Sequence, residues 1–186
     1  MKHVKKASKR TRAITGASLA AAVALGGFGA YSASASDTAR AVAAPAANVK
    51  GNATTTTTHL TIDAAVKAAQ AALDAAGKEG QKVTVAVVDR NGNTIVTLRG
   101  DGAGPQSPES AVKKAYTAVA WNAPTSELVK RLDNAPTLKD IPGTLFLAGG
   151  APVTAKNAPI AGIGVAGAPS GALDEKFARA GVDALD

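Results

Sequence analysis

The chain contains no cysteine among its 186 residues, and Met1 is its only methionine. It therefore forms no disulfide, has no thiolate nucleophile and offers no cysteine ligand to a metal. Histidine is almost as scarce, since His3 and His59 are the only two. HExxH and GxxxxGK[ST] motifs are absent, and no glycine run forms GxGxxG between an expected strand and helix. The sequence thus gives little support to thiol, zinc-peptidase, P-loop or dinucleotide chemistry.

Aromatic residues make up only 3% of the chain, and its positive charge is concentrated at one end. Six of the 21 lysine and arginine residues lie between residues 2 and 12, and no acidic residue precedes Asp37. Without this segment, 15 basic residues face 14 acidic ones. Nucleic-acid binding requires a basic surface and is often helped by aromatic side chains that stack on bases. We therefore expect no nucleic-acid partner.

The N-terminal 35 residues have the pattern of a secretory signal peptide. The basic start is followed by an apolar, small-residue run from Ala13 to Ala30, and Ala33-Ser34-Ala35 supplies a cleavage site. We expect cleavage after Ala35 and a secreted, extracellular protein. Residues 36–58, rich in alanine and threonine, are expected to form a flexible linker, with an extended edge strand in its last residues as the lesser alternative. Residues 59–186 suit one domain.

A β-hairpin is the strongest local feature of this domain. Two β-branched runs, residues 83–88 and 94–98, flank Asn91-Gly92, a pair that tolerates the positive φ values of a tight turn. The second run leads into the glycine-rich loop Arg99–Gly104. This loop is either a simple connector or a place where the backbone approaches a ligand closely.

Helix and strand signals alternate along the rest of the domain. Apolar spacing, capping residues, prolines and glycines predict helices over residues 62–76, 107–121, 124–132 and 171–185, and further strands over residues 144–148 and 160–167. The short connections favour antiparallel pairing. The expected fold is therefore α/β of the α+β type, an antiparallel sheet with packed helices.

The helix expected over residues 107–121 has two faces of interest. Projection at 100° per residue predicts a core face made of Val112, Ala115, Tyr116 and Val119. On another side, Lys113, Thr117 and Trp121 form a stripe at i, i+4 and i+8. Trp121, the only tryptophan, either packs within its own domain or belongs to a ligand pocket or a subunit interface.

Few residues could bind iron or another metal. Haem iron could be held by His59, by the phenolate of Tyr116, by a weak oxygen ligand such as Thr117, or by no side chain. Free iron would depend on carboxylates such as Asp174 and Glu175, which are nonspecific ligands for hard cations. A Ser–His–Asp catalytic triad would have to use His59, which lies at the edge of the linker, and we do not expect such a triad.

Five motifs together resemble the GlcG/HbpS family: VAVVDRNGN, LRGDGA, KKAYTA, LAGGAPV and GIGVAGAPSG, in this order. The resemblance spans about residues 60–185 and implies an α/β, profilin-like fold with an antiparallel sheet. It also implies a haem-binding protein, either a sensor component or a haem scavenger, assembled as a homo-octamer. We expect no enzymatic activity, because the sequence offers no credible base–nucleophile pair. Such members report redox and iron stress to the extracytoplasmic domain of a membrane sensor kinase in a two-component system.

The resemblance assigns the haem contact to Thr117, within KKAYTA. We add from the stripe that Lys113 could reach a propionate and that Trp121 could stack on the haem. The wider family leaves an alternative, a small-molecule enzyme or accessory subunit that uses the Arg99–Gly104 loop. In that case Arg99 would bind a carboxylate and Asp101 would act as a base.

Overall fold

The computed structural model describes residues 48–186, and residues 49–186 form one compact unit. The expected signal peptide and residues 36–47 of the expected linker lie outside the described residues. Residues 48–58 are exposed and contain one 3₁₀ turn, Gly51–Ala53, and no strand. Within the described part of the chain, no helix combines the length and the apolar character needed to span a membrane.

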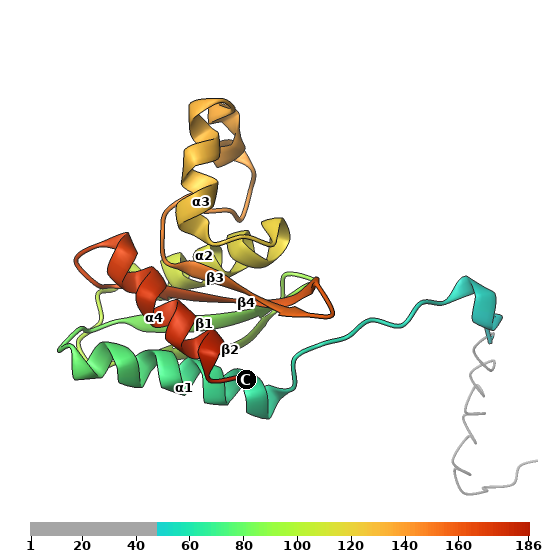
Figure 1. Ribbon diagram of the computed structural model, residues 1–186, viewed down its shortest axis with the longest axis horizontal. Coiled ribbons are helices and arrows are strands. Elements are labelled where there is room, and N and C mark those ends of the chain that lie inside the picture. Colours follow the sequence, from blue (N-terminus) through green and yellow to red (C-terminus); the bar gives the residue numbers. More distant parts are fainter. Residues whose placement is uncertain (1–47) are drawn as a thin grey trace, which may run out of the picture. The chain divides into compact units, whose positions relative to one another are not determined.

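Four helices and a four-stranded sheet make up this unit, and every pair of neighbouring strands is antiparallel (Figure 1). The strand order is β2-β1-β4-β3. The expected α+β architecture is thereby confirmed. In chain order the elements are α1 (Ile62–Lys78), β1 (Thr84–Asp89), β2 (Thr94–Arg99), α2 (Ser107–Trp121), α3 (Thr125–Val129), β3 (Gly150–Ala155), β4 (Ala158–Ala166) and α4 (Gly171–Asp183).

The sheet lies between two helical layers, with α1 and α4 on one face and α2 on the other. Strand β1 is central, so both of its faces are buried. Val85 and Val87 pack in the core beneath α1 and α4, whereas Ala86 and Val88 pack against α2. This alternation follows from the two-residue period of a strand.

Two glycines of β4 allow α2 to lie unusually close to the sheet. A Cβ atom at Gly162 would overlap the carbonyl of Ala115, and one at Gly164 would overlap the carbonyl of Ala111. The backbone of α2 therefore occupies the space that side chains would fill elsewhere. Glycine within a strand often marks the close approach of another backbone, and here that neighbour is α2.

The strand expected over residues 144–148 is absent from the structure, and that prediction was wrong. These residues form a loop over α2, in which the Leu145 amide donates to the Thr117 hydroxyl (2.8 Å) and Phe146 is buried. The edge strand β3 begins only at Gly150. It joins β4 through Lys156-Asn157, both with positive φ (51° and 61°). Lysine is uncommon in this left-handed conformation, so the turn was hard to recognise in the sequence.

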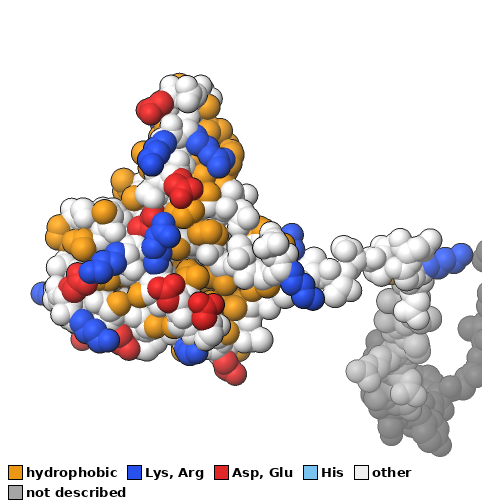
Figure 2. Space-filling model, in the orientation of Figure 1, with side chains coloured by type: hydrophobic (Ala, Val, Ile, Leu, Met, Phe, Trp, Pro, Cys, Tyr) orange, Lys and Arg blue, Asp and Glu red, His pale blue; other side chains and the backbone are white. Residues whose placement is uncertain are grey.

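Charges on the domain face shown in Figure 2 are mixed, with basic and acidic side chains interspersed and apolar side chains between them. This distribution accords with the near balance of 15 basic and 14 acidic residues outside the basic N-terminal segment. Residues Thr125–Asp140, which include α3, project from the sheet layer in Figure 1. This projection covers the end of α2.

We predict that Gly164→Ala lowers the free energy of unfolding by about 1–3 kcal/mol, because the added methyl group must displace α2 from the sheet. Gly77→Ala is the matched control, since a Cβ there meets nothing within 4 Å in α1. It should stabilise the domain by about 0.5–1 kcal/mol. Chemical denaturation measures both, and equal effects of the two changes would contradict the close packing of α2.

Candidate functional site

The β1–β2 turn is held by Asp89 at the end of β1. Its Oδ1 atom accepts hydrogen bonds from the backbone amides of Asn91 (2.8 Å) and Asn93 (2.9 Å). Burial acts to raise the pKa of Asp89, but the hydrogen bonds from Asn93 and Asn91 outweigh it, so the pKa is lowered. The carboxylate thus stays charged and orders the turn, in which Gly92 has a φ of +89°.

This turn places Gly92 against the aromatic ring of Tyr116 on α2. A Cβ at Gly92 would lie 2.8 Å from Tyr116 Cε2, and one at Gly143 would lie 3.6 Å from Cε1. Gly92 therefore makes room for the ring, whereas a Cβ at Gly143 would be in ordinary van der Waals contact with it. Within residues 48–186 the Tyr116 hydroxyl has no hydrogen-bond partner, so its oxygen is free to bind a ligand.

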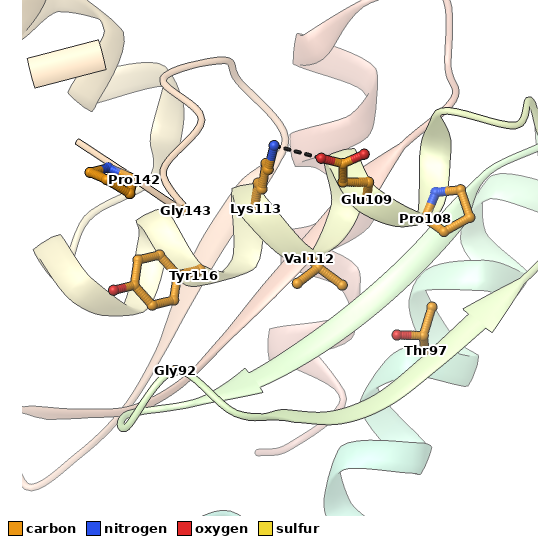
Figure 3. Close-up of a pocket in the computed structure, with 9 residues that line it drawn as sticks. All are labelled: Gly92, Thr97, Pro108, Glu109, Val112, Lys113, Tyr116, Pro142 and Gly143. Carbon is orange, nitrogen blue, oxygen red and sulfur yellow. Dashed lines mark ion pairs between the residues drawn. The ribbon is translucent and has the colours of Figure 1, made fainter. Parts of the chain in front are cut away.

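A groove of about 740 Å³ opens beside this ring, between the β1–β2 hairpin, the first three turns of α2 and the loop at Pro142 (Figure 3). The volume is within the range of small-molecule and cofactor sites. Prolines, a valine and the tyrosine ring make its surface largely apolar. The lining residues are Gly92, Thr97, Pro108, Glu109, Val112, Lys113, Tyr116, Pro142 and Gly143.

One ion pair lies at the edge of the groove. Lys113 Nζ is 2.6 Å from Glu109 Oε1, one helical turn away, and the lysine side chain is 41% exposed. The hydrogen bond from Lys113 lowers the pKa of Glu109, and the charge of Lys113 adds to this effect. An exposed pair of this kind contributes little to stability. The groove therefore combines an apolar wall, a free phenol and a part-exposed cation.

The predicted core face of α2 was partly wrong. Ala115 and Val119 do pack on the sheet, but Val112 and Tyr116 are only half-buried and line the groove. Ala111 and Ala118 are fully buried instead. Because β4 carries glycines opposite α2, only small side chains fit at the point of closest approach, and the larger ones lie to the side.

The predicted stripe of Lys113, Thr117 and Trp121 does not form one surface. Thr117 is fully buried, and its hydroxyl donates to the Lys113 carbonyl (2.7 Å) while it accepts from the Leu145 amide (2.8 Å). Thr117 was placed off the core face of the helix, and it is nevertheless buried because the 144–147 loop covers this side of α2. A haem contact by Thr117 stays a prediction, and it requires that loop to move.

Trp121 packs within its own domain, which was one of the open alternatives. Its ring meets Phe146 edge to face, with centroids 5.8 Å apart, in a cluster with Leu128. Arg131 lies over the ring at 5.6 Å, a distance that suits a cation–π contact. Trp121 thus attaches the projecting segment to α2 and does not line the groove.

Asp174 was named as a candidate ligand for free iron, but the structure shows its carboxylate engaged inside the protein. Its side chain is 5% exposed and lies 2.7 Å from Nζ of Lys114, which is also buried. The second carboxylate oxygen accepts from the Ala168 amide (3.0 Å). Burial raises the pKa of Asp174 more than the bond to Lys114 and the backbone amides lower it. Both oxygens are thus used within the protein.

Glu175 is likewise buried and engaged. It accepts hydrogen bonds from the amide (2.9 Å) and hydroxyl (2.7 Å) of Ser126 and from Arg179 (2.9 Å). Burial acts to raise the pKa of Glu175, but the hydrogen bonds from Ser126 and Arg179 together outweigh burial, so the pKa is lowered. His59 is exposed and pairs with Thr57 (2.7 Å). No cluster of three or more metal-ligating side chains occurs in residues 48–186.

The Arg99–Gly104 loop closes on itself. Arg99 Nη2 donates to the Ala103 carbonyl (2.7 Å), and the Gly104 carbonyl accepts from the Ser107 hydroxyl (2.7 Å). Arg99 does not line the groove, so the structure does not bring it together with Tyr116 and Lys113. The exposed Asp101 at the tip makes no side-chain hydrogen bond within the described chain.

Sequence reasoning missed Lys114, the largest fully buried side chain. A signal was present, since residue 114 projects between Ala111, Ala115 and Ala118, all of which are small and buried. A lysine within such a face indicates a buried partner, because an unpaired charge there is very costly.

Comparison with known proteins identifies relatives of the whole described domain. The model of a family described as haem degrading protein, HbpS-like, matches residues 60–183. HbpS of Streptomyces reticuli, solved as a double glutamate-to-aspartate mutant, is 72% identical, covering 77% of this chain and 98% of its own, with a TM-score of 0.75.

Two more distant solved structures share the fold. Protein ORFY of Klebsiella pneumoniae is 26% identical, covering 70% of this chain and 94% of its own, with a TM-score of 0.66. PduOC, solved as a complex with haem, is 27% identical, covering 68% and 95% of the two chains, with a TM-score of 0.63. No curated protein matches the chain.

We predict that Thr117→Val lowers the free energy of unfolding by about 1–3 kcal/mol, because the Leu145 amide loses its acceptor. Thr94→Val, at the exposed first position of β2, is the matched control. Its free energy of unfolding should stay within about 0.5 kcal/mol of the wild-type value. Urea denaturation measures both. Hydrogen exchange at Leu145 should also accelerate, and an unchanged rate would contradict the role of the hydroxyl.

We predict that the domain loses stability as the pH falls below about 4.5, in part through Glu175. Its pKa is lower in the folded state, so the unfolded chain binds more protons and stability rises with pH. Glu175→Gln should reduce this slope. Glu127→Gln, at an exposed position of α3 without a side-chain bond among the described residues, should leave it unchanged. Denaturation series at several pH values test the difference.

Proposed function

The chain belongs to the HbpS-like haem-degrading protein family, and from this premise we propose that it binds haem in the groove beside Tyr116. The haem-containing structure of PduOC supports the ligand class. The groove itself is the observation that carries the proposal. In the described domain, the groove has an apolar surface large enough for a porphyrin, and beside it lies the unbonded hydroxyl oxygen of Tyr116.

The residues of the groove fit the chemistry of haem. Val112, Pro108 and Pro142 offer apolar contacts to a porphyrin face. The Tyr116 oxygen is a known type of axial ligand for haem iron. Lys113 is placed to exchange its partner Glu109 for a propionate. Bound haem would supply iron-centred redox chemistry, while these side chains orient it and exclude water from one face.

One assignment from the resemblance, Thr117, and one from the helical stripe, Trp121, change under this proposal. Thr117 is replaced by its neighbour Tyr116 as the iron ligand, because the Thr117 hydroxyl already has both a donor and an acceptor partner. Trp121 keeps its structural contacts and does not stack on the haem. Lys113 retains the role that was expected of it.

We further propose a secreted homo-oligomer, an octamer in line with the resemblance, that presents haem status outside the cell. The N-terminal signal pattern supports export. The 72% identity to HbpS supports a shared assembly. The extracytoplasmic domain of a membrane sensor kinase would be the partner that reads redox or iron stress. An iron-ion site remains a prediction without assigned ligands, since Asp174 and Glu175 are engaged in internal bonds.

Haem degradation is the second candidate function, and the family description favours it. The expectation from the sequence was binding without catalysis, and this expectation stays a prediction. Loss of the Soret band after addition of a reductant and oxygen would establish degradation. A stable spectrum under the same conditions would support binding alone.

A haemin titration followed by absorbance, with size-exclusion chromatography, tests the proposal. The wild type should show a saturable Soret shift, and Tyr116→Phe should weaken binding by about tenfold and change the spectrum, because the oxygen ligand is lost. Lys113→Gln should weaken it by about two- to fivefold.

Lys67→Gln, an exposed lysine of α1 on the opposite face of the sheet, controls for charge and should have no effect. Thr117→Val separates the two candidate ligands. If Thr117→Val abolishes the shift while Tyr116→Phe retains it, the iron ligand is Thr117 and the groove assignment is wrong. If the wild type shows no shift, haem binding itself is wrong.

A further inference from the structure

A second cavity, of about 360 Å³, lies on the other side of α2 from the groove. It is enclosed by the first half of α2, the end of β4 and the loop that leads into α4, with Leu147 at its edge. None of its lining residues lines the groove. The volume is near the lower limit for small-molecule sites, so any ligand must be small.

The buried Lys114 and Asp174 both line this cavity. Lys114 Nζ donates to the Val165 carbonyl (3.0 Å) and to Asp174 Oδ2 (2.7 Å). A lysine ammonium has three donors, so one N–H remains uncommitted within the described structure. In a site of low dielectric, an acceptor placed there would form a strong, charge-assisted bond.

Other polar groups of the cavity lack partners as well. The Ser110 hydroxyl and the Gln106 side-chain amide make no hydrogen bond within residues 48–186. In contrast, the Ser107 hydroxyl is occupied by Gly104 and Thr84, and the Ser170 hydroxyl caps α4. The cavity therefore presents unused donors from Lys114, Ser110 and Gln106 to a ligand that carries oxygen acceptors.

The charge of Asp174 limits the ligand further. Its carboxylate balances Lys114, so a dianion such as phosphate would be repelled. Its oxygens are held by Lys114 and the Ala168 amide, so they compete little for the remaining donors. A single carboxylate has enough acceptor atoms for these donors and adds only one negative charge. The backbone at the start of α4 also lines the cavity, and the N-terminal end of a helix favours an anion.

We propose that this cavity binds a small monocarboxylate, whose oxygens accept from the third N–H of Lys114 and from Ser110 and whose short apolar end lies against Leu147. The site is independent of haem and uses the opposite side of α2. It would make the domain a receptor for a second class of small molecule.

Equilibrium dialysis of the haem-free protein against radiolabelled propionate at millimolar concentrations tests the proposal. The wild type should bind saturably, with one site per chain. Ser110→Leu should abolish binding because the larger side chain occupies the cavity, while Lys114 and Asp174 themselves are retained. Ser110→Ala keeps the space but loses the hydroxyl, and it should weaken binding by about two- to tenfold.

Ala120→Leu, an exposed position on the last turn of α2, is the matched control and should bind as the wild type does. Absence of saturable binding to the wild type would overturn the site, as would full binding by Ser110→Leu. Propionamide as competitor tests the charge: equal displacement by the neutral amide would overturn the assignment to a carboxylate. None of these readouts depends on haem, so failure here is distinct from failure of the groove.

Discussion

The buried ion pair between Lys114 and Asp174 connects the two helical layers of this domain. Lys114 extends from α2 past the start of β3 and meets Asp174 in the first turn of α4. The path exists because Gly149 has no side chain: a Cβ there would lie 2.6 Å from Lys114 Nζ. Such a pair need not add net stability, but removing one partner leaves a buried charge and costs about 3–5 kcal/mol. The arrangement of the layers therefore depends on both residues.

The same ion pair determines which way α2 faces. With Lys114 directed inward, the neighbouring Lys113 lies at the edge of the groove, and Thr117, one turn later, is also buried. Tyr116 is left at the side of the helix, where Gly92 makes room for its ring. One helix thus carries the wall of the groove beside Tyr116 on one side and the polar cavity on the other. Neither site could form if α2 rotated about its axis.

Local features of the sequence predicted most of the fold. The Asn91-Gly92 turn and the start of α1 at residue 62 depend on residues close together in the chain, so they can be recognised without knowledge of the whole fold. The candidate site was predicted only in part. Lys113 and Tyr116 were named as candidate site residues and line one groove, whereas Asp174 and Glu175, named as candidate ligands for free iron, are engaged in internal bonds. Their partners, Lys114 and Ser126, are more than 45 residues away, which no local pattern reveals.

By itself, the sequence determined the helices, the hairpin, the antiparallel class of the sheet and the scarcity of sulfur and imidazole ligands, because each depends on composition or on neighbours within a few residues. Only the tertiary structure decided which side of α2 is exposed. An amphipathic projection assumes one buried face, but α2 is covered by the sheet on one side and by the 144–147 loop on another. Because α2 packs closely on Gly162 and Gly164, only small residues fit on the side of α2 that faces the sheet. The larger Val112 and Tyr116 lie beside this contact and line the groove.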